Sequence, residues 1–414
     1  MEQTKNFKKN FIWNVLGTGL NAFNSLFFLI IVTRINGTDN AGIFTIAFST
    51  ACVIYIIGTY AGRVYQVTEN DKSITDKDYI VNRVISFGLM ILATISFVLV
   101  RKYNLYKSTI FLLLSIYKGL EAFSDVLYGI MQKNDLLYRV GQSYFLKSIL
   151  SVIIFFIVDF TTKNLIYACV AIILIWIFLI IIMDLPITKK LINEDEKFSW
   201  DGIQKIFKNG FFVFAITFLG LYVLNATKYS IDTYLSEETQ AIFGYIVMPA
   251  TAIGLAAQLL IHPFLNQVAD LCEKKDFKEL RKLCYKLAII IFLFGIICAI
   301  LAYFIGTQIL GFIYGVDLNL YKLDLAVIII ASTLYTIGVI YSSILTSTRK
   351  TFSQFVIYIV VAVFAYISAN LLTKYQNMRG AVISYFLIML LQFLMYNLYI
   401  EYFFHKQFNK AKNG

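Results

Sequence analysis

Residues 108–133 read STIFLLLSIYKGLEAFSDVLYGIMQK, an apolar run that continues into a segment with three charges, Lys118, Glu121 and Asp125. At 100° per residue these charges share one helix face with Tyr128 and Gln132, within an arc of about 80°. One charge that faces lipid costs about 2.5–3.5 kcal/mol, so three would cost about 8–10 kcal/mol. The segment therefore predicts a membrane-spanning helix whose charged face is turned toward protein or water.

The chain on both sides of this segment is equally apolar. Of its 414 residues, 59% are hydrophobic, 15% are charged and 3 are prolines. A soluble domain cannot bury so much apolar surface, because its outer face must be polar. The sequence predicts an all-α polytopic membrane protein with spans of about 20–25 residues, each long enough to cross a bilayer. We expect twelve spans, near 11–32, 41–62, 79–100, 108–130, 141–160, 164–184, 210–232, 240–264, 283–306, 325–346, 351–372 and 380–403.

Basic residues are distributed unevenly between the segments that connect these spans. With the N-terminus inside, 24 of the 36 Lys and Arg residues fall on the cytoplasmic side, 8 on the other side and 4 within spans. Cytoplasmic segments of membrane proteins are enriched in Lys and Arg, so we expect both termini in the cytoplasm. The same distribution explains the net charge of +11 without a nucleic-acid partner. The first span is full length and lacks a small-residue cleavage site, which argues against a cleaved signal peptide.

The two halves of the chain begin with similar sequences. FKKNFIWNVLGTGLNAFNSLFF at 7–28 resembles FKNGFFVFAITFLGLYVLNATK at 207–228. Further on, Ile43-Phe44 matches Ile242-Phe243, so the offset between the two halves stays at 199 to 200 residues. Because each half has an even number of predicted spans, the halves would be parallel repeats with a substrate path between them. We expect an N-terminal six-helix bundle at 1–184, a charged cytoplasmic linker at 185–209 and a C-terminal six-helix bundle at 210–414. Chance similarity between aromatic-rich helices is the alternative.

Polar side chains also form stripes on the first predicted helix of each half. Asn14 and Asn21 share a narrow face in the first half, and Asn225, Lys228 and Asp232 do so in the second. We expect them to line a shared polar cavity together with the stripe of the fourth span. Interhelical hydrogen bonds without substrate contact are the alternative for the asparagines, and a structural ion pair is the alternative for Lys118 with Glu121.

Three further cations would make the first half electropositive. Arg63 ends the second span, Arg83 lies one turn inside the third, and Lys147 lies within the fifth. Together they would suit a phosphate group, since the guanidinium fork binds phosphate oxygens through two hydrogen bonds. Anchoring at the cytoplasmic surface is the alternative for Arg63, whereas Arg83 is too deep for that role alone.

Motifs for catalysis and for metal binding are missing from the sequence. There is no Walker loop, nucleophile elbow, paired-histidine motif or Rossmann fingerprint, so no catalytic residue and no bound cofactor is expected. The 5 cysteines and 2 histidines are scattered, which argues against a disulfide framework and a zinc site. A membrane-embedded polysaccharide polymerase or ligase is an alternative class, but such an enzyme usually has a large outside loop, and the outside loops here are short.

Several segments together resemble the polysaccharide transporter family, the Wzx-type flippases of lipid-linked oligosaccharides in the MOP exporter superfamily. These segments are GTYAGRVYQVTE at 58–69, YKGLEAFSDVLYGIMQK at 117–133, YVLNATKYSIDTYL at 222–235 and GFIYGVDLNLYKLDL at 311–325. The resemblance runs the whole length, and it rests on the order of the segments because no single motif is diagnostic. It implies a MATE/MOP-like fold with two six-helix bundles around a central cavity.

The resemblance also implies a function. The substrate would be an undecaprenyl-pyrophosphate-linked repeat unit of capsule, O-antigen or exopolysaccharide, moved from the cytoplasmic to the outer leaflet of a bacterial cell membrane by alternating access. Partners would be this lipid-linked oligosaccharide, membrane lipids and, as an open question, a polysaccharide polymerase. Coupling to a gradient of H⁺ or Na⁺ is compatible with the family but is not indicated by these residues. A cation-coupled multidrug exporter of the same fold is the alternative, although drug exporters usually show a less basic cavity.

Overall fold

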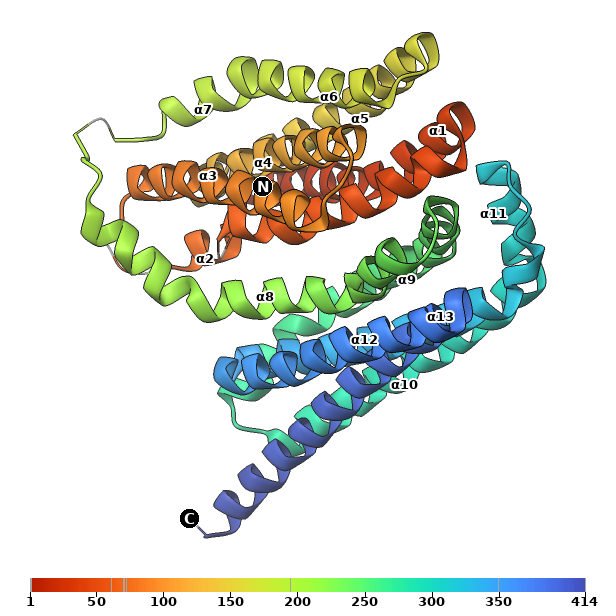
Figure 1. Ribbon diagram of the computed structural model, residues 1–414. Coiled ribbons are helices and arrows are strands. Elements are labelled where there is room, and N and C mark those ends of the chain that lie inside the picture. Colours follow the sequence, from red (N-terminus) through yellow and green to blue (C-terminus); the bar gives the residue numbers. More distant parts are fainter. Residues whose placement is uncertain are drawn as a thin grey trace. The chain divides into compact units, whose positions relative to one another are not determined.

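The computed structural model consists of helices joined by short segments, with no strand among the residues that it describes (Figure 1). These are residues 2–60, 62–69, 71, 73–193, 195–348 and 350–413. Their side chains are described except at 2–8, 255–263, 265–266, 269, 347, 408 and 410–413. The chain divides into two compact units, Met1–Phe218 and Leu219–Gly414.

Unit 1 is built around helix α4. This helix packs against α1, α2, α3, α5 and α6, so its side chains meet protein on most sides. The helices of unit 1 are α1 (Glu2–Thr59), α2 (Gly62–Thr68), α3 (Asp76–Arg101), α4 (Leu105–Lys133), α5 (Leu137–Thr162), α6 (Leu165–Leu179), the π-helical turn η1 (Ile180–Asp184), α7 (Leu185–Lys189) and the first part of α8 (Trp200–Tyr234).

Unit 2 is built around helix α12, which packs against α9, α10 and α13. It contains the second part of α8 and the remaining helices of the chain. These are α9 (Glu237–Glu273), α10 (Phe277–Leu301), the π-helical turn η2 (Ala302–Gly306), α11 (Thr307–Tyr314), the 3-10 turn η3 (Asn319–Tyr321), α12 (Lys322–Ser347) and α13 (Thr351–Asn413).

The ends of α3 show why the helices begin and end where they do. Thr75 accepts a hydrogen bond from the backbone of Asp78, whose side chain bonds back to the Thr75 backbone, so the first turn has a complete capping box. At the other end Lys102 has a left-handed backbone, with φ 54°, and its N–H bonds to carbonyls of the last turn. Asn104 then caps α4 by accepting from the backbone N–H of Lys107.

Elements α1 and α13 each consist of two helices that meet at a kink, and each kink lies in a region where the sequence predicts a break between two spans. The predicted loop at 33–40 is helical except at Gly37, which has φ 83° and ψ 177°, and α13 has a similar break at Asn377. One residue with positive φ is enough to bend the chain, and glycine adopts that conformation without steric penalty. Eight helical stretches among the described residues are long and apolar enough to cross a membrane, including both bent helices. The number of twelve spans stays a prediction.

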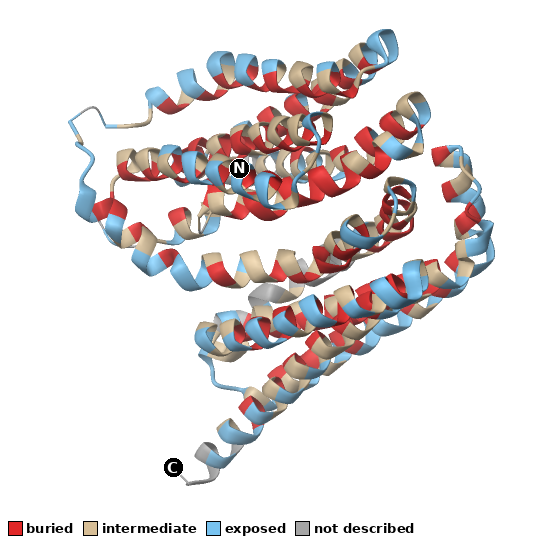
Figure 2. Cartoon of the chain, in the orientation of Figure 1, coloured by how far each residue is buried: buried red, intermediate tan, exposed pale blue. Residues whose placement is uncertain are grey.

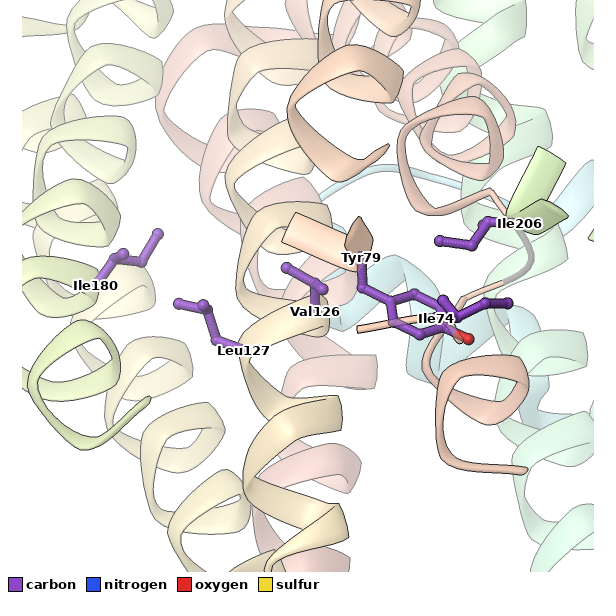
Figure 3. Packing of buried hydrophobic residues seen from close by; sticks show 6 residues of the cluster. All are labelled: Ile74, Tyr79, Val126, Leu127, Ile180 and Ile206. Atoms are coloured by element: carbon purple, nitrogen blue, oxygen red, sulfur yellow. The ribbon is translucent and has the colours of Figure 1, made fainter. Parts of the chain in front are cut away.

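The outer faces of the helices are apolar, as expected for lipid contact. On α3, Leu92, Leu99 and Val100 are 61%, 69% and 80% exposed. Figure 2 shows buried residues along the faces of α3, α4 and α5 that turn toward neighbouring helices. One buried cluster at the end of α4 joins α4 to α3, η1 and α8 (Figure 3); its members are Ile74, Tyr79, Val126, Leu127, Ile180 and Ile206. This packing holds α4 in place where its charged face enters the interior of unit 1.

Candidate functional site

The charged face of α4 lies in the interior of unit 1. The side chains of Lys118, Glu121 and Asp125 are 13%, 9% and 10% exposed, so none of them lies on the outer surface. Each of the three has a partner of opposite charge, as the energetic argument for this face requires. The partners come from α4 itself, from α2 and from α3.

Lys118 and Glu121 form an ion pair along one turn of α4. The Nζ of Lys118 lies 2.7 Å from Oε2 of Glu121, and the Nδ2 of Asn21 on α1 donates to the other carboxylate oxygen at 2.9 Å. The hydroxyl of Ser148 on α5 donates in turn to the Oδ1 of Asn21 at 3.4 Å. The pair therefore joins α1, α4 and α5, as the alternative of a structural ion pair predicts for Lys118 and Glu121.

Asp125 is shared by two arginines. The Nη2 of Arg83 lies 3.5 Å from Oδ2 of Asp125, and the Nε of Arg63 lies 3.9 Å from Oδ1. Arg83, whose side chain is 3% exposed, also donates from Nη1 to the carbonyl oxygen of Gly58 at 2.9 Å. The Arg63 side chain is 21% exposed. The Nη1 of Arg63 and the Nε of Arg83 are buried without a hydrogen-bond partner in the described part of the chain.

Lys147 lies in a second network, which reaches α4 at Ser124 and Tyr128. Its Nζ donates to Oδ2 of Asp184 at 2.5 Å, to the hydroxyl of Ser124 at 2.7 Å and to the hydroxyl of Tyr128 at 3.0 Å. Ser143 donates to the second carboxylate oxygen of Asp184 at 2.7 Å. The ammonium group has three donors, and all three are used. The side chains of Lys147 and Asp184 are 0% and 1% exposed, so this network is fully enclosed.

Sequence reasoning missed Asp184. It is the one acidic residue in the apolar stretch 165–187 and it ends the sixth predicted span. An acidic residue at the edge of a span is easily interpreted as the start of the cytoplasmic segment, whereas the structure places Asp184 at the end of the π-helical turn η1. An ionisable residue within an apolar span needs a named partner, and that rule would have pointed to Lys147.

The predicted cavity residues at the N-terminal part of α1 and in α8 include two asparagines with hydrogen bonds inside their own helices. Asn14 accepts a hydrogen bond from the Thr18 hydroxyl through its backbone carbonyl at 2.5 Å, and its buried Oδ1 has no partner among the described residues. Asn225 donates from its side chain to the backbone carbonyl of Leu221 in its own helix at 2.9 Å. Lys228 and Asp232 are partly buried on the same helix. A cavity shared by these residues and the charges of unit 1 stays a prediction.

The charges in these ion pairs nearly balance. Arg63, Arg83, Lys118 and Lys147 provide four positive charges, and Glu121, Asp125 and Asp184 provide three negative ones. The sequence predicts a more electropositive half, because it does not reveal that Asp125 and Asp184 are the partners of these cations. Among the described residues no group of three or more His, Cys, Asp or Glu could hold a metal ion. An anion needs cations with donors left, and in these ion pairs buried donor nitrogens without any partner among the described residues are found on Arg63 and Arg83.

Comparison with known proteins identifies the fold. No protein-family model matches the sequence. The chain is 24% identical over 408 residues to the capsular polysaccharide biosynthesis protein CapF of Staphylococcus aureus, a match that covers 97% of this chain and 99% of CapF. CapF is therefore a distant relative over its full length.

Solved structures with the same fold are transporters. An inward-facing multidrug resistance MATE family transporter of the MOP superfamily superposes with a TM-score of 0.65, at 13% identity and 96% coverage of both chains. The Vibrio cholerae MATE transporter VcmN in its bent form gives a TM-score of 0.62, at 12% identity and 98% coverage of both. A MOP superfamily transporter from Pyrococcus furiosus, in which a reverse polarity of the binding pocket suggests a different function, gives 0.56 at 14% identity and 96% coverage of both. The all-helical, MATE-like fold, a multi-pass membrane fold, is thus confirmed for this chain.

Proposed function

We propose that the chain is a flippase for undecaprenyl-pyrophosphate-linked oligosaccharides, which it moves from the cytoplasmic to the outer leaflet of a bacterial cell membrane. The product of this step would be used for capsule, O-antigen or exopolysaccharide. The full-length similarity to CapF supports a role in polysaccharide biosynthesis, and the MATE-like fold supports transport rather than catalysis.

The observation that carries the substrate class is the pair of arginines at Asp125. A pyrophosphate diester has two negative charges, and its passage through a low-dielectric interior requires cations with free donors. Arg63 and Arg83 meet this requirement, because each keeps one buried N–H donor without a partner among the described residues. The arginine fork also fits two phosphate oxygens at once, which a lysine cannot do.

Lys147 has a different role in this proposal from the one that its sequence position suggests. Its three donors are occupied by Asp184, Ser124 and Tyr128, so it has none to offer a phosphate. We assign it to the stability of unit 1. Lys118 and Glu121 contribute to the wall of the site, while Asn14, Asn21, Asn225, Lys228 and Asp232 would contact the sugars.

The transport cycle follows from the proposed topology. Both termini and the linker 185–209 would face the cytoplasm, between an N-terminal bundle at 1–184 and a C-terminal bundle at 210–414. The pyrophosphate would bind from the cytoplasmic side. Arg63 in α2 and Arg83 near the start of α3 flank the segment between the second and third predicted spans, which would be cytoplasmic. The lipid tail would remain in the membrane between the bundles while the cavity changes its opening from one side to the other. Coupling to a gradient of H⁺ or Na⁺ is compatible with this cycle.

Complementation of a bacterial strain that lacks its own flippase tests this proposal. The chain, expressed with the glycosyltransferases of its own polysaccharide, should restore surface polymer and remove the lipid-linked repeat units that accumulate inside. The alternative, cation-coupled drug export, is measured with the same plasmid in a strain without drug pumps. Drug resistance without any surface polymer, at normal membrane levels of the protein, would overturn the flippase in favour of the exporter. A polymerase or ligase would lengthen or attach repeat units that are already outside, and would leave the inner accumulation unchanged.

A further inference from the structure

We infer that Asp125 is an internal counter-ion, which occupies the anion site while that site is empty and is displaced when a phosphate group binds to Arg63 and Arg83. This inference rests on the proposed function, since the displacing anion is the pyrophosphate of the substrate. It adds a role for one residue: Asp125 competes with the substrate for the two arginines.

The distances separate Asp125 from Glu121 and Asp184, the two other carboxylates in these networks. Charge-assisted hydrogen bonds between nitrogen and carboxylate are usually about 2.7–2.9 Å long. Glu121 and Asp184 each have such a contact, at 2.7 Å and 2.5 Å. Asp125 has only looser contacts with the two arginine side chains, at 3.5 Å and 3.9 Å. Its contacts with both guanidinium groups are loose, so a better ligand can replace it there.

The unpartnered donors show what that ligand must supply. An arginine has five N–H donors, and Arg83 uses Nη1 on Gly58 and Nη2 on Asp125 while its Nε stays unpaired. The side chain is 3% exposed, so water does not replace the missing partner. The Nη1 of Arg63 is unpaired and buried as well. A phosphate group has several acceptor oxygens, and it can therefore fill positions around both guanidinium groups that the two oxygens of Asp125 leave empty.

Access to the site comes through Arg63. Its side chain is 21% exposed, in contrast to the enclosed Arg83, so an anion would meet Arg63 first and then reach Arg83. The carbonyl of Gly58 holds the Arg83 fork through Nη1, while Nη2 exchanges Asp125 for the phosphate and the unpaired Nε gains a partner. A carboxylate and a phosphate repel each other at contact distance in a low-dielectric interior, so both cannot stay on the arginines. Binding of the substrate therefore requires Asp125 to leave.

Binding measurements on the purified full-length protein test the inference, with geranyl pyrophosphate as the probe. If Asp125 occupies the arginines for about nine-tenths of the time, its removal raises the apparent affinity about tenfold. We expect this tenfold gain for Asp125→Asn. Asp76→Asn is the matched control, because it removes a carboxylate that is paired with Lys133, at 3.1 Å, and lies outside the proposed anion site. We expect an unchanged affinity for it.

The outcomes separate the two proposals. Binding by the wild type with equal or weaker binding by Asp125→Asn would overturn the counter-ion and leave the anion site intact. An equal gain in both variants would show a general effect of charge and would also overturn it. No binding by any of the three proteins would overturn the anion site and the counter-ion together.

A measurement on the wild type covers the case that Asp125→Asn does not fold. Protein with ¹³C-labelled aspartate carboxyl groups is studied by infrared difference spectroscopy on addition of geranyl pyrophosphate. A shift of an aspartate carboxylate band supports the displacement, and binding of the probe without any such shift overturns it.

Discussion

The ammonium nitrogen of Lys147 lies 2.5 Å from Oδ2 of Asp184, and the side chains of the two residues are 0% and 1% exposed. Removal of one partner from a buried ion pair leaves an uncompensated charge and costs about 3–5 kcal/mol. We therefore expect Asp184→Asn to lower the melting temperature of the purified protein strongly. The double variant Lys147→Gln with Asp184→Asn removes both charges and keeps polar groups for Ser124, Tyr128 and Ser143. It should recover a large part of the loss.

Fluorescence-detected size-exclusion chromatography after heating measures these variants. Asp71→Asn is the control, because Asp71 lies 4.0 Å from Lys205 with both side chains about 40% exposed (41% and 38%). Exposed ion pairs contribute little to stability, so its melting temperature should equal that of the wild type. A normal melting temperature for Asp184→Asn would contradict the structural role of the pair.

The ion pair of Lys118 and Glu121 allows a test of structure against transport. We expect Lys118→Glu and Glu121→Lys each to abolish surface polymer, because each replaces the ion pair by two neighbouring like charges in the interior of unit 1. The double variant restores the pair with opposite direction. If it restores export, the pair serves to join the helices; if it is stable but inactive, the direction of the charges matters to the substrate.

How much of this arrangement could be predicted from the sequence depends on whether the partners lie on one helix. The charged face of α4 follows from helical periodicity, and Lys118 with Glu121, three residues apart, is visible in it. The partnership of Arg83 with Asp125 joins residues 42 positions apart, and that of Lys147 with Asp184 joins residues 37 apart. Such contacts depend on how α3 packs against α4 and how α5 packs against η1. A helix wheel describes one helix and carries no information on this packing.

The fold class could be predicted for a related reason. Apolar stretches longer than a bilayer is thick can only form membrane helices, whatever their neighbours are. The sequence places a break between two spans at 33–40, but a polar segment of this kind fits a short loop as well as a kink between two helices. The backbone of Gly37 and the hydrogen bond from Asn36 to Asp159, at 2.6 Å, decide between the two in the structure.

The crossing of α1 and α5 depends on Gly141. A Cβ atom at this position would lie 2.2 Å from the backbone carbonyl of Trp13, and a backbone cannot move aside as a flexible side chain can. Overpacking of this kind costs about 1–3 kcal/mol, so we expect Gly141→Ala to lower the melting temperature. Gly88→Ala is the matched control, since nothing lies within 4 Å of its Cβ position in α3. Alanine favours the helix there, and the control should melt at or above the wild-type temperature. Equal effects of both substitutions would contradict the close crossing.

Labelling of single cysteines tests the topology in a variant without native cysteines. Ser236 is exposed at the start of α9, and the proposed orientation puts it outside the cell. A cysteine at this position should react with a membrane-impermeant maleimide in intact cells. A cysteine at Asn193, in the linker 185–209, should react only after the cells are opened. The reverse pattern would contradict the orientation that the distribution of Lys and Arg predicts.

Arg83 gives the sharpest test of the proposed function. We expect Arg83→Ala to lose export and Arg83→Lys to keep a fraction of it, because lysine preserves the charge but not the planar fork that reaches Gly58 and a phosphate together. Surface polymer is measured in a strain without its own flippase, and the membrane level of each variant is checked. Removal of Arg83 also leaves Asp125 with Arg63 alone, so folding must be separated from function. The double variant Arg83→Ala with Asp125→Asn removes this unbalanced charge and should be stable yet inactive. Full export by Arg83→Ala at a normal membrane level would exclude Arg83 from the site and leave Arg63 as the cation that binds the pyrophosphate.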